Sequence, residues 1–77
     1  MKINVGLIGL GRVAQLAYLK NLIGIKSIKS ISICDKNLKL LNKVSKKYKI
    51  KKTYLEFQKM IKKEELDIVF VIVNRFL

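Results

Sequence analysis

The sequence contains no histidine and a single cysteine, Cys34, among its 77 residues. One cysteine excludes an internal disulfide, and without histidine the chain lacks the residues of a Cys-His metal site, so no metal centre is predicted. Because histidine is the side chain that ordinarily titrates near neutral pH, acid–base catalysis here would need a strongly shifted lysine or carboxylate. A reduced, cytoplasmic setting is expected for a chain with this cysteine content.

The chain also lacks any apolar run that approaches the ~20 residues needed to span a bilayer. Its beginning carries three glycines before Arg12, where a secretory signal would have a continuous apolar core. We therefore expect no membrane partner.

Acidic residues are few: the chain has 5 Asp and Glu against 17 Lys and Arg, which gives a net charge of +12. Only Arg12 and Arg75 are arginines, and eight lysines with no acid lie from Lys36 to Leu55. Forked contacts to phosphates and bases favour arginine, so we interpret the lysines as a solvated surface. Nucleic-acid binding through residues 36–52 is the alternative. In either case the charge attracts an anionic cofactor.

A glycine-containing stretch follows the first apolar run of the chain. Ile3–Ile8 is rich in β-branched and aliphatic residues and too short for a helix, so it is predicted to be a buried strand. Gly9 allows a sharp reversal, Gly11 lets a ligand approach the backbone, and Ala14 lets the next helix pack closely on the strand. This spacing places the unpaired N–H groups of a helix start where a pyrophosphate binds.

The rest of the chain alternates helical and strand patterns. The expected elements are, in order, a strand at Ile3–Ile8, a helix from Val13 to Ile23, a strand from Ile28 that ends at Cys34-Asp35, a helix from Leu38 to Tyr48, a short strand at Ile50–Tyr54, a helix containing Phe57, Met60 and Ile61, and a strand at Ile68–Val73. Such alternation predicts an α/β fold with a parallel sheet and right-handed crossovers. We therefore predict a partial Rossmann fold, with about four strands in the order 3-2-1-4 and three helices.

Local signals mark the ends of several elements. Gly24 is expected to end the first helix and Asn37 to cap the second. Thr53-x-x-Glu56 resembles a capping box at the start of the third helix. The continuous apolar run Ile68–Val73 is typical of a strand that is covered on both faces.

Asp35 supports a dinucleotide site at the glycine turn. It lies 24 residues after Gly11, at the end of the strand expected beside the first one. A carboxylate in that place can accept hydrogen bonds from both hydroxyls of a ribose, although a turn or capping role is the alternative. An acid disfavours the 2′-phosphate of NADP, whereas the neighbouring Lys36 partly offsets that repulsion. NAD is the predicted cofactor and NADP the alternative.

Four blocks of the sequence resemble, in order and spacing, the glucose-fructose oxidoreductase and inositol dehydrogenase family (Gfo/Idh/MocA). These blocks are Val5 to Ala14, Ser30 to Asp35, Tyr54 to Phe57 and Asp67 to Val71. The resemblance covers essentially the whole chain. It implies that the pyrophosphate is lined by Gly9, Gly11, Arg12 and Val13, the adenosine ribose by Asp35 and Lys36, and the nicotinamide by Val73 and Asn74. Leu10, between the two glycines, is also expected to bind the cofactor. The family's Thr-Pro-Asn is Ile72-Val73-Asn74 here, so only the asparagine matches.

The same resemblance implies an oxidoreductase that acts on CH–OH groups of sugar-like or cyclitol-like molecules. The family's catalytic lysine, in a Glu-Lys-Pro motif, its downstream His or Asp, and its C-terminal substrate domain would all follow residue 77. We therefore expect residues 1–77 to be a partial N-terminal NAD(P)-binding domain, a truncated chain or a fragment, with no catalytic residue and no catalysis of its own. A stand-alone nucleotide-binding module that works with a partner chain is the alternative.

The last predicted strand raises a separate expectation about partners. Val69 to Val73 would form an uncharged strand at the edge of the sheet. Exposed apolar edges pair readily with other chains, so we expect the chain to self-associate through this strand.

Overall fold

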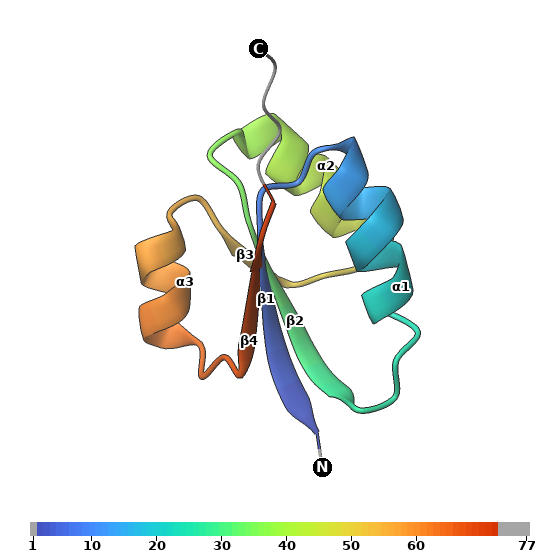
Figure 1. The fold of residues 1–77 in the computed structure, drawn as a ribbon. Helices are drawn as coiled ribbons and strands as arrows, with labels where there is room; N and C mark the ends of the chain where they lie inside the picture. Colours follow the sequence, from blue (N-terminus) through green and yellow to red (C-terminus); the bar gives the residue numbers. More distant parts are fainter. Residues whose placement is uncertain (1, 73–77) are drawn as a thin grey trace.

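The fold is a four-stranded parallel sheet with helices on both faces, seen in a computed structural model that describes residues 2–72 (Figure 1). The strands are β1 (Ile3–Ile8), β2 (Ile28–Cys34), β3 (Lys52–Tyr54) and β4 (Ile68–Val71). Their order in the sheet is β3-β2-β1-β4, and every neighbouring pair is parallel. The predicted α/β class and partial Rossmann topology are confirmed.

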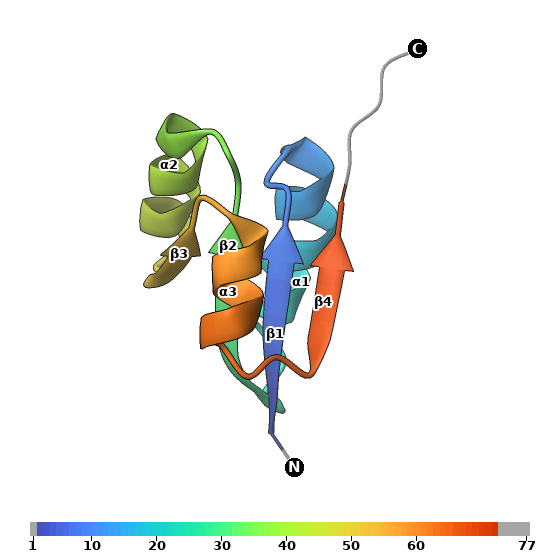
Figure 2. The same ribbon diagram turned by 90° about the vertical axis from the view of Figure 1, so that its left-hand side faces the viewer.

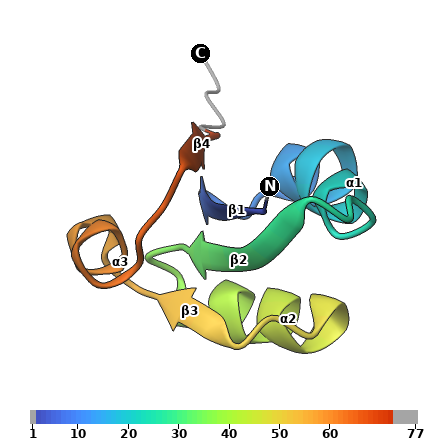
Figure 3. The same ribbon diagram turned by 90° about the horizontal axis from the view of Figure 1, so that it is seen from below.

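The helices divide between the two faces of this sheet. They are a π-helix η1 (Ala14–Leu19) that continues into α1 (Lys20–Leu22), then α2 (Leu38–Tyr48) and α3 (Phe57–Lys63). Viewed along the strands, η1, α1 and α2 cover one face and α3 covers the other (Figure 3). All four strands point the same way, so their carboxyl ends meet at one end of the sheet (Figure 2).

The main core lies between the sheet and the face that carries η1 and α2. Leu7 and Ile33 come from the two central strands and are fully buried, as strand alternation requires of residues on one face. Leu41 and Val44, three positions apart on α2, pack against them. This core fixes β1 and β2 side by side and brings their carboxyl ends together.

The first helix is wound differently from the prediction. Ala14 and Leu19 are both fully buried although they lie five positions apart, because a π-turn brings residues of that spacing onto one side. Val13 and Leu16 are 51% and 54% exposed, so they do not share the buried side of the helix with Ala14 and Leu19. The prediction of a helix here is confirmed.

The capping signals had different outcomes. Asn37 caps α2 as predicted, since its side-chain oxygen accepts a hydrogen bond from the Leu40 N–H at 3.1 Å. The predicted capping box at Thr53 is wrong: α3 begins at Phe57, with Glu56 in extended conformation as the N-cap and no side-chain cap. Thr53 belongs instead to β3, where the pairing with β2 determines its conformation.

The last strand lies at the edge of the sheet, as predicted, but it is not covered on both faces. Phe70 packs on Tyr18, with ring centroids 5.6 Å apart. Ile68 and Val69 are exposed, and Val71 is 63% exposed.

Among residues 2–72, no helix is long and apolar enough to cross a membrane.

A side-chain cluster links β3 to the end of α3. The Tyr54 hydroxyl donates a hydrogen bond to Glu64, and the Lys52 ammonium lies 3.1 Å from the other carboxylate oxygen. The Tyr54 hydrogen bond, followed by contact with Lys52, lowers the pKa of Glu64 below its ordinary value of 4.5. The same hydrogen bond raises the pKa of Tyr54. The cluster therefore favours charged Glu64 and neutral Tyr54.

We expect this cluster to make the fold sensitive to acid. Because the pKa of Glu64 is lowered in the folded state, its stabilising contribution is present above pH 4.5 and is lost as the pH falls through the folded value. Glu64→Gln should lower the free energy of unfolding at pH 7 by roughly 1–2 kcal/mol, and the difference should shrink in acid. Urea unfolding at several pH values measures it.

Glu65→Gln is the matched control for this experiment, because Glu65 is the next residue along the chain and its side chain is exposed. It should change the free energy of unfolding by less than about 0.5 kcal/mol. Equal effects of the two substitutions at pH 7 would contradict the role given to Glu64.

Candidate cofactor-binding site

A cleft of about 990 Å³ lies at the carboxyl ends of the strands. Its lining comes from the glycine turn, the end of β2, the start of α3 and the edge strand β4, and includes Gly9, Gly11, Asp35, Lys36, Leu55, Phe57, Val69 and Val71. Pockets that hold cofactors and other small molecules measure about 300–1,000 Å³, so this cleft has the size of a cofactor site. Its position between β1 and the neighbouring strands is where ligands of open α/β sheets bind.

Gly9 makes the turn that opens this cleft. Its φ of +93° is a conformation that residues with a side chain rarely adopt. A Cβ atom built on Gly9 would lie 2.1 Å from the carbonyl oxygen of Ile72. The Ile72 N–H also donates to the Ile8 carbonyl at 2.9 Å. The turn is therefore packed directly against the end of β4, in a space that only glycine fits.

Leu10 is held at both of its backbone polar groups. Its N–H donates to Oδ2 of Asp35 at 2.9 Å, and its carbonyl accepts from Nε2 of Gln15 at 2.8 Å. The leucine side chain itself is fully buried in the core. These contacts fix the chain between the two glycines before any ligand is present.

Asp35 is the residue that joins the two strand ends of the site. Besides the bond from Leu10, its Oδ1 accepts a hydrogen bond from the Asn37 N–H at 2.8 Å. The predicted alternative, a turn or capping role, is thus present in the structure. A carboxylate offers about four acceptor positions, so both oxygens can still accept hydrogen bonds from a ligand hydroxyl. The geometry allows the ribose role and the turn role together.

Cys34 lies beside Asp35 in the lining of the cleft and is buried. Burial, and then the nearby charge of Asp35, raises the pKa of the Cys34 thiol. The thiol therefore stays protonated at neutral pH and is a poor nucleophile. Cys34 therefore forms part of the wall of the cleft.

The structure gathers most of the predicted site residues at one place. Gly9, Leu10, Gly11, Asp35 and Lys36 all line the cleft. Arg12 lines an adjoining groove of about 230 Å³ that also includes Leu10 and Gly11, while Val13 lines neither space. Val73 and Asn74 lie outside the described residues.

Several residues of the site were not predicted. Gln15 was missed because its side chain acts on the turn backbone, and an amide at that position has no distinctive sequence signal. Leu55 and Phe57 line the cleft from the segment after β3. Their position after a predicted parallel strand was the available signal, since all such segments emerge at the same edge of the sheet.

Comparison with known families agrees with this geometry. Residues 3–77 match the profile of the Gfo/Idh/MocA family, which is described as an oxidoreductase family with an NAD-binding Rossmann fold. The chain belongs to this family. The predicted Gfo/Idh/MocA resemblance is confirmed, and NAD is the cofactor that the family description gives, as predicted.

Several solved structures show the same fold. A Gfo/Idh/MocA oxidoreductase from Vibrio cholerae is 26% identical with a TM-score of 0.85, covering 95% of this chain and 23% of that one. Myo-inositol 2-dehydrogenase from Lactobacillus plantarum is 23% identical with a TM-score of 0.82, covering 96% and 22%. Scyllo-inositol dehydrogenase from Lactobacillus casei, with bound NAD(H) and scyllo-inositol, is 20% identical with a TM-score of 0.80, covering 96% and 22%.

The chain thus spans less than a quarter of the length of these three solved chains. A comparison with curated proteins gave no match. Within residues 2–72, there is no group of three or more His, Cys, Asp or Glu side chains that could hold a metal ion.

Proposed function

We propose that this chain is the cofactor-binding part of an NAD-dependent oxidoreductase that acts on CH–OH groups of sugar-like or cyclitol-like molecules. The observation that carries the proposal is the glycine turn fixed by Asp35 at the mouth of a cofactor-sized cleft. Two of the three solved structures compared above are of inositol dehydrogenases, which supports the substrate class. In this proposal residues 1–77 form the N-terminal domain, and substrate is bound by a C-terminal domain beyond them.

Each part of the site then has a binding role. The backbone from Gly9 to Gly11, with Arg12 beside it, holds the pyrophosphate, because helix starts and glycine turns present N–H groups to anions. Asp35 accepts hydrogen bonds from the adenosine ribose. Lys36 lines the same cleft, which supports NADP as the alternative cofactor.

The nicotinamide side of the site rests on Val73 and Asn74, as the resemblance to the family predicts. Bound NAD supplies the hydride chemistry of the complete enzyme. The residues of this chain bind and orient the cofactor, and none is proposed to transfer a proton. The isolated chain should therefore show no substrate-dependent reduction of NAD.

A substitution at Gly11 tests the cofactor site. Gly11 has no positive φ, so a valine there keeps the backbone conformation while its side chain enters the lining of the cleft. We expect Gly11→Val to weaken NAD binding about tenfold, because the backbone can no longer approach the pyrophosphate closely. Isothermal titration with NAD measures the change.

Gly24→Val is the matched control, because Gly24 is exposed, has no positive φ and lies outside the cleft. Its affinity for NAD should match that of the unsubstituted chain within about twofold. If Gly11→Val binds NAD as tightly as Gly24→Val, the cofactor does not bind at the glycine turn.

A second candidate function is a stand-alone nucleotide-binding module that works with a partner chain. The exposed apolar side chains of the edge strand β4 favour this candidate, because such a strand offers a surface for another chain to cover. The same surface supports the predicted self-association through Val69 to Val73, of which Val73 lies outside the described residues.

Self-association should be measurable by sedimentation. We expect the chain to form dimers or larger species at micromolar concentration. Val71→Lys should shift it toward monomer, because a charge on an edge strand opposes pairing. Lys62→Gln, on the exposed surface of α3, should leave the distribution unchanged. A monodisperse monomer for the unsubstituted chain would rule this out.

The cytoplasm is the proposed location. The single cysteine is a free, buried thiol, which supports a reducing compartment.

A further inference from the structure

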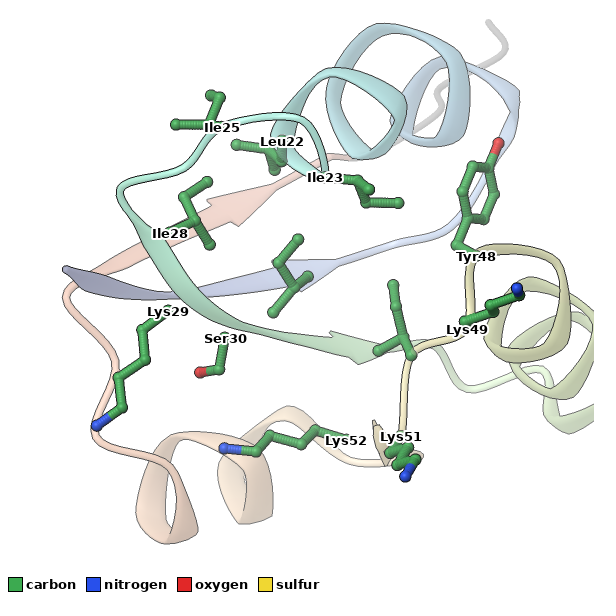
Figure 4. Close-up of a pocket in the computed structure, with 12 residues that line it drawn as sticks. Leu22, Ile23, Ile25, Ile28, Lys29, Ser30, Tyr48, Lys49, Lys51 and Lys52 are labelled. Atoms are coloured by element: carbon green, nitrogen blue, oxygen red, sulfur yellow. The ribbon is translucent and has the colours of Figure 1, made fainter.

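A second hollow, of about 330 Å³, lies beside the amino-terminal half of β2, away from the cofactor cleft (Figure 4). Its 12 lining residues include four lysines and no acid. The others are mainly isoleucine and leucine side chains from the end of α1, from β2 and from the segment after α2. The hollow therefore combines an apolar wall with a strongly basic one.

The floor of the hollow includes a strand edge that no other strand covers. Strand β3 pairs with β2 only from Ser32 to Cys34, so within residues 2–72 the stretch 28–31 has a strand neighbour only on the β1 side. Burial changes at the same point: Ser32 is buried, whereas Lys29 is exposed. Four residues of strand measure about 13 Å, which is enough to pair with a short extended peptide.

The two sides of this strand edge differ in chemistry. Figure 4 shows Ile23 and Ile25 on one side of β2 and Lys29, Lys51 and Lys52 on the other. Ile25 is 46% exposed, so the apolar side is open to a ligand. A peptide added as a strand directs alternate side chains to the two sides. The groove thus matches a peptide in which apolar and acidic residues alternate.

The charges in this groove are largely uncompensated. Lys52 contacts Glu64 at 3.1 Å, whereas no ion pair within residues 2–72 involves Lys29, Lys49 or Lys51. The lining of the groove carries four lysines and no acid, so its charge is complementary to an anionic partner.

Lys49 is placed in the groove at a conformational cost. It follows α2 with φ +56° and ψ +47°, the left-handed conformation in which glycine is the usual residue. It is the one non-glycine residue among residues 2–72 with a positive φ. This conformation ends α2, since the Lys49 N–H donates to the Ser45 carbonyl, and it brings Lys49 into the lining of the groove.

We propose that the uncovered edge of β2 at residues 28–31 binds an acidic, extended segment of a partner protein as an added strand. The peptide's apolar side chains lie toward Ile23 and Ile25, and its acidic side chains lie toward Lys29 and Lys51. Backbone hydrogen bonds to the strand edge supply affinity, and the two walls supply specificity. This site is separate from the cofactor cleft, so it does not depend on the proposed oxidoreductase function.

The test uses the 77-residue chain and a labelled hexapeptide, Glu-Val-Glu-Val-Glu-Val, with both ends blocked. Fluorescence anisotropy should show saturable binding, with amide NMR shifts concentrated at residues 28–31. Lys51→Glu should weaken binding about tenfold, whereas Lys43→Glu, on the exposed surface of α2 and outside the groove, should weaken it less than about twofold. Lys49→Gly relieves the backbone strain and should still weaken binding.

Two further probes separate strand addition from general attraction. A hexapeptide of the same sequence with N-methylated valines keeps its charges but loses backbone donors, and it should bind at least tenfold more weakly than the parent, on the order expected for lost hydrogen bonds. Equal binding of the methylated peptide would overturn the proposal. So would equal effects of Lys51→Glu and Lys43→Glu, or shifts spread along α2 with displacement by single-stranded DNA.

Discussion

Gly9→Ala is expected to destabilise the chain more than any other single methyl addition, by at least about 3 kcal/mol. Two costs add at this position. The φ of +93° is strained for any residue with a Cβ atom, and that atom would lie 2.1 Å from the Ile72 carbonyl oxygen. The contact is with backbone, so no side-chain rotation relieves it. Small domains are stable by only about 5 kcal/mol, so most of the stability should be lost. Urea unfolding followed by circular dichroism measures the change in the free energy of unfolding.

Gly24→Ala is the control for this substitution. A Cβ atom on Gly24 would have its nearest neighbour, the Asn21 carbonyl oxygen, at an ordinary 3.7 Å, and its φ is not positive. We expect a change of less than about 0.5 kcal/mol. If Gly9→Ala unfolds at the same urea concentration as Gly24→Ala, the turn does not have the conformation described.

Asp35→Ala is expected to reduce the affinity for NAD about a hundredfold, through two separate losses. The first is the loss of the ribose acceptor that the proposed site requires. The second is structural, because the N–H groups of Leu10 and Asn37 lose the carboxylate that holds them at 2.9 and 2.8 Å. The glycine turn is then no longer fixed in the geometry that receives the pyrophosphate. Isothermal titration with NAD measures the combined effect.

A thermodynamic cycle separates these two losses of affinity by comparing NAD with a modified NAD on the unsubstituted chain and on Asp35→Ala. NAD that lacks the adenosine 2′-hydroxyl should bind the unsubstituted chain about tenfold more weakly than NAD does, because one charge-assisted hydrogen bond is lost. The same comparison in Asp35→Ala should give almost no difference, since the acceptor is already absent. An equal loss in both chains would show that Asp35 acts on the turn alone.

The topology and the position of the site could be predicted because the signals for them are local. The apolar run Ile3–Ile8, the turn at Gly9 and the cap at Asn37 each depend on a few neighbouring residues, and all three have the predicted structure. Parallel pairing then brings Asp35 to the glycine turn, since the strands end at one edge of the sheet. The family resemblance adds the cofactor to that location.

What could not be predicted depends on tertiary contacts. The π-turn after Ala14 brings Ala14 and Leu19, five positions apart, into one core, and a search for a periodicity of 3.6 residues does not reveal that pairing. The capping box failed because Thr53 pairs in β3, and strand pairing overrode the local signal. The hydrogen bonds that the Asp35 carboxylate accepts from the N–H groups of Leu10 and Asn37 depend on the exact approach of two loops, which sequence spacing does not define.

NMR mapping of NAD on the labelled 77-residue chain tests the central claim most directly. Binding should be saturable with one NAD per chain, and the largest amide shifts should fall on Gly9, Leu10, Gly11 and Asp35, which line the cleft. Gly24, which lies outside it, should keep its position in the spectrum. Absence of binding at millimolar NAD, or shifts that avoid the glycine turn, would contradict the assignment of this chain as a cofactor-binding domain.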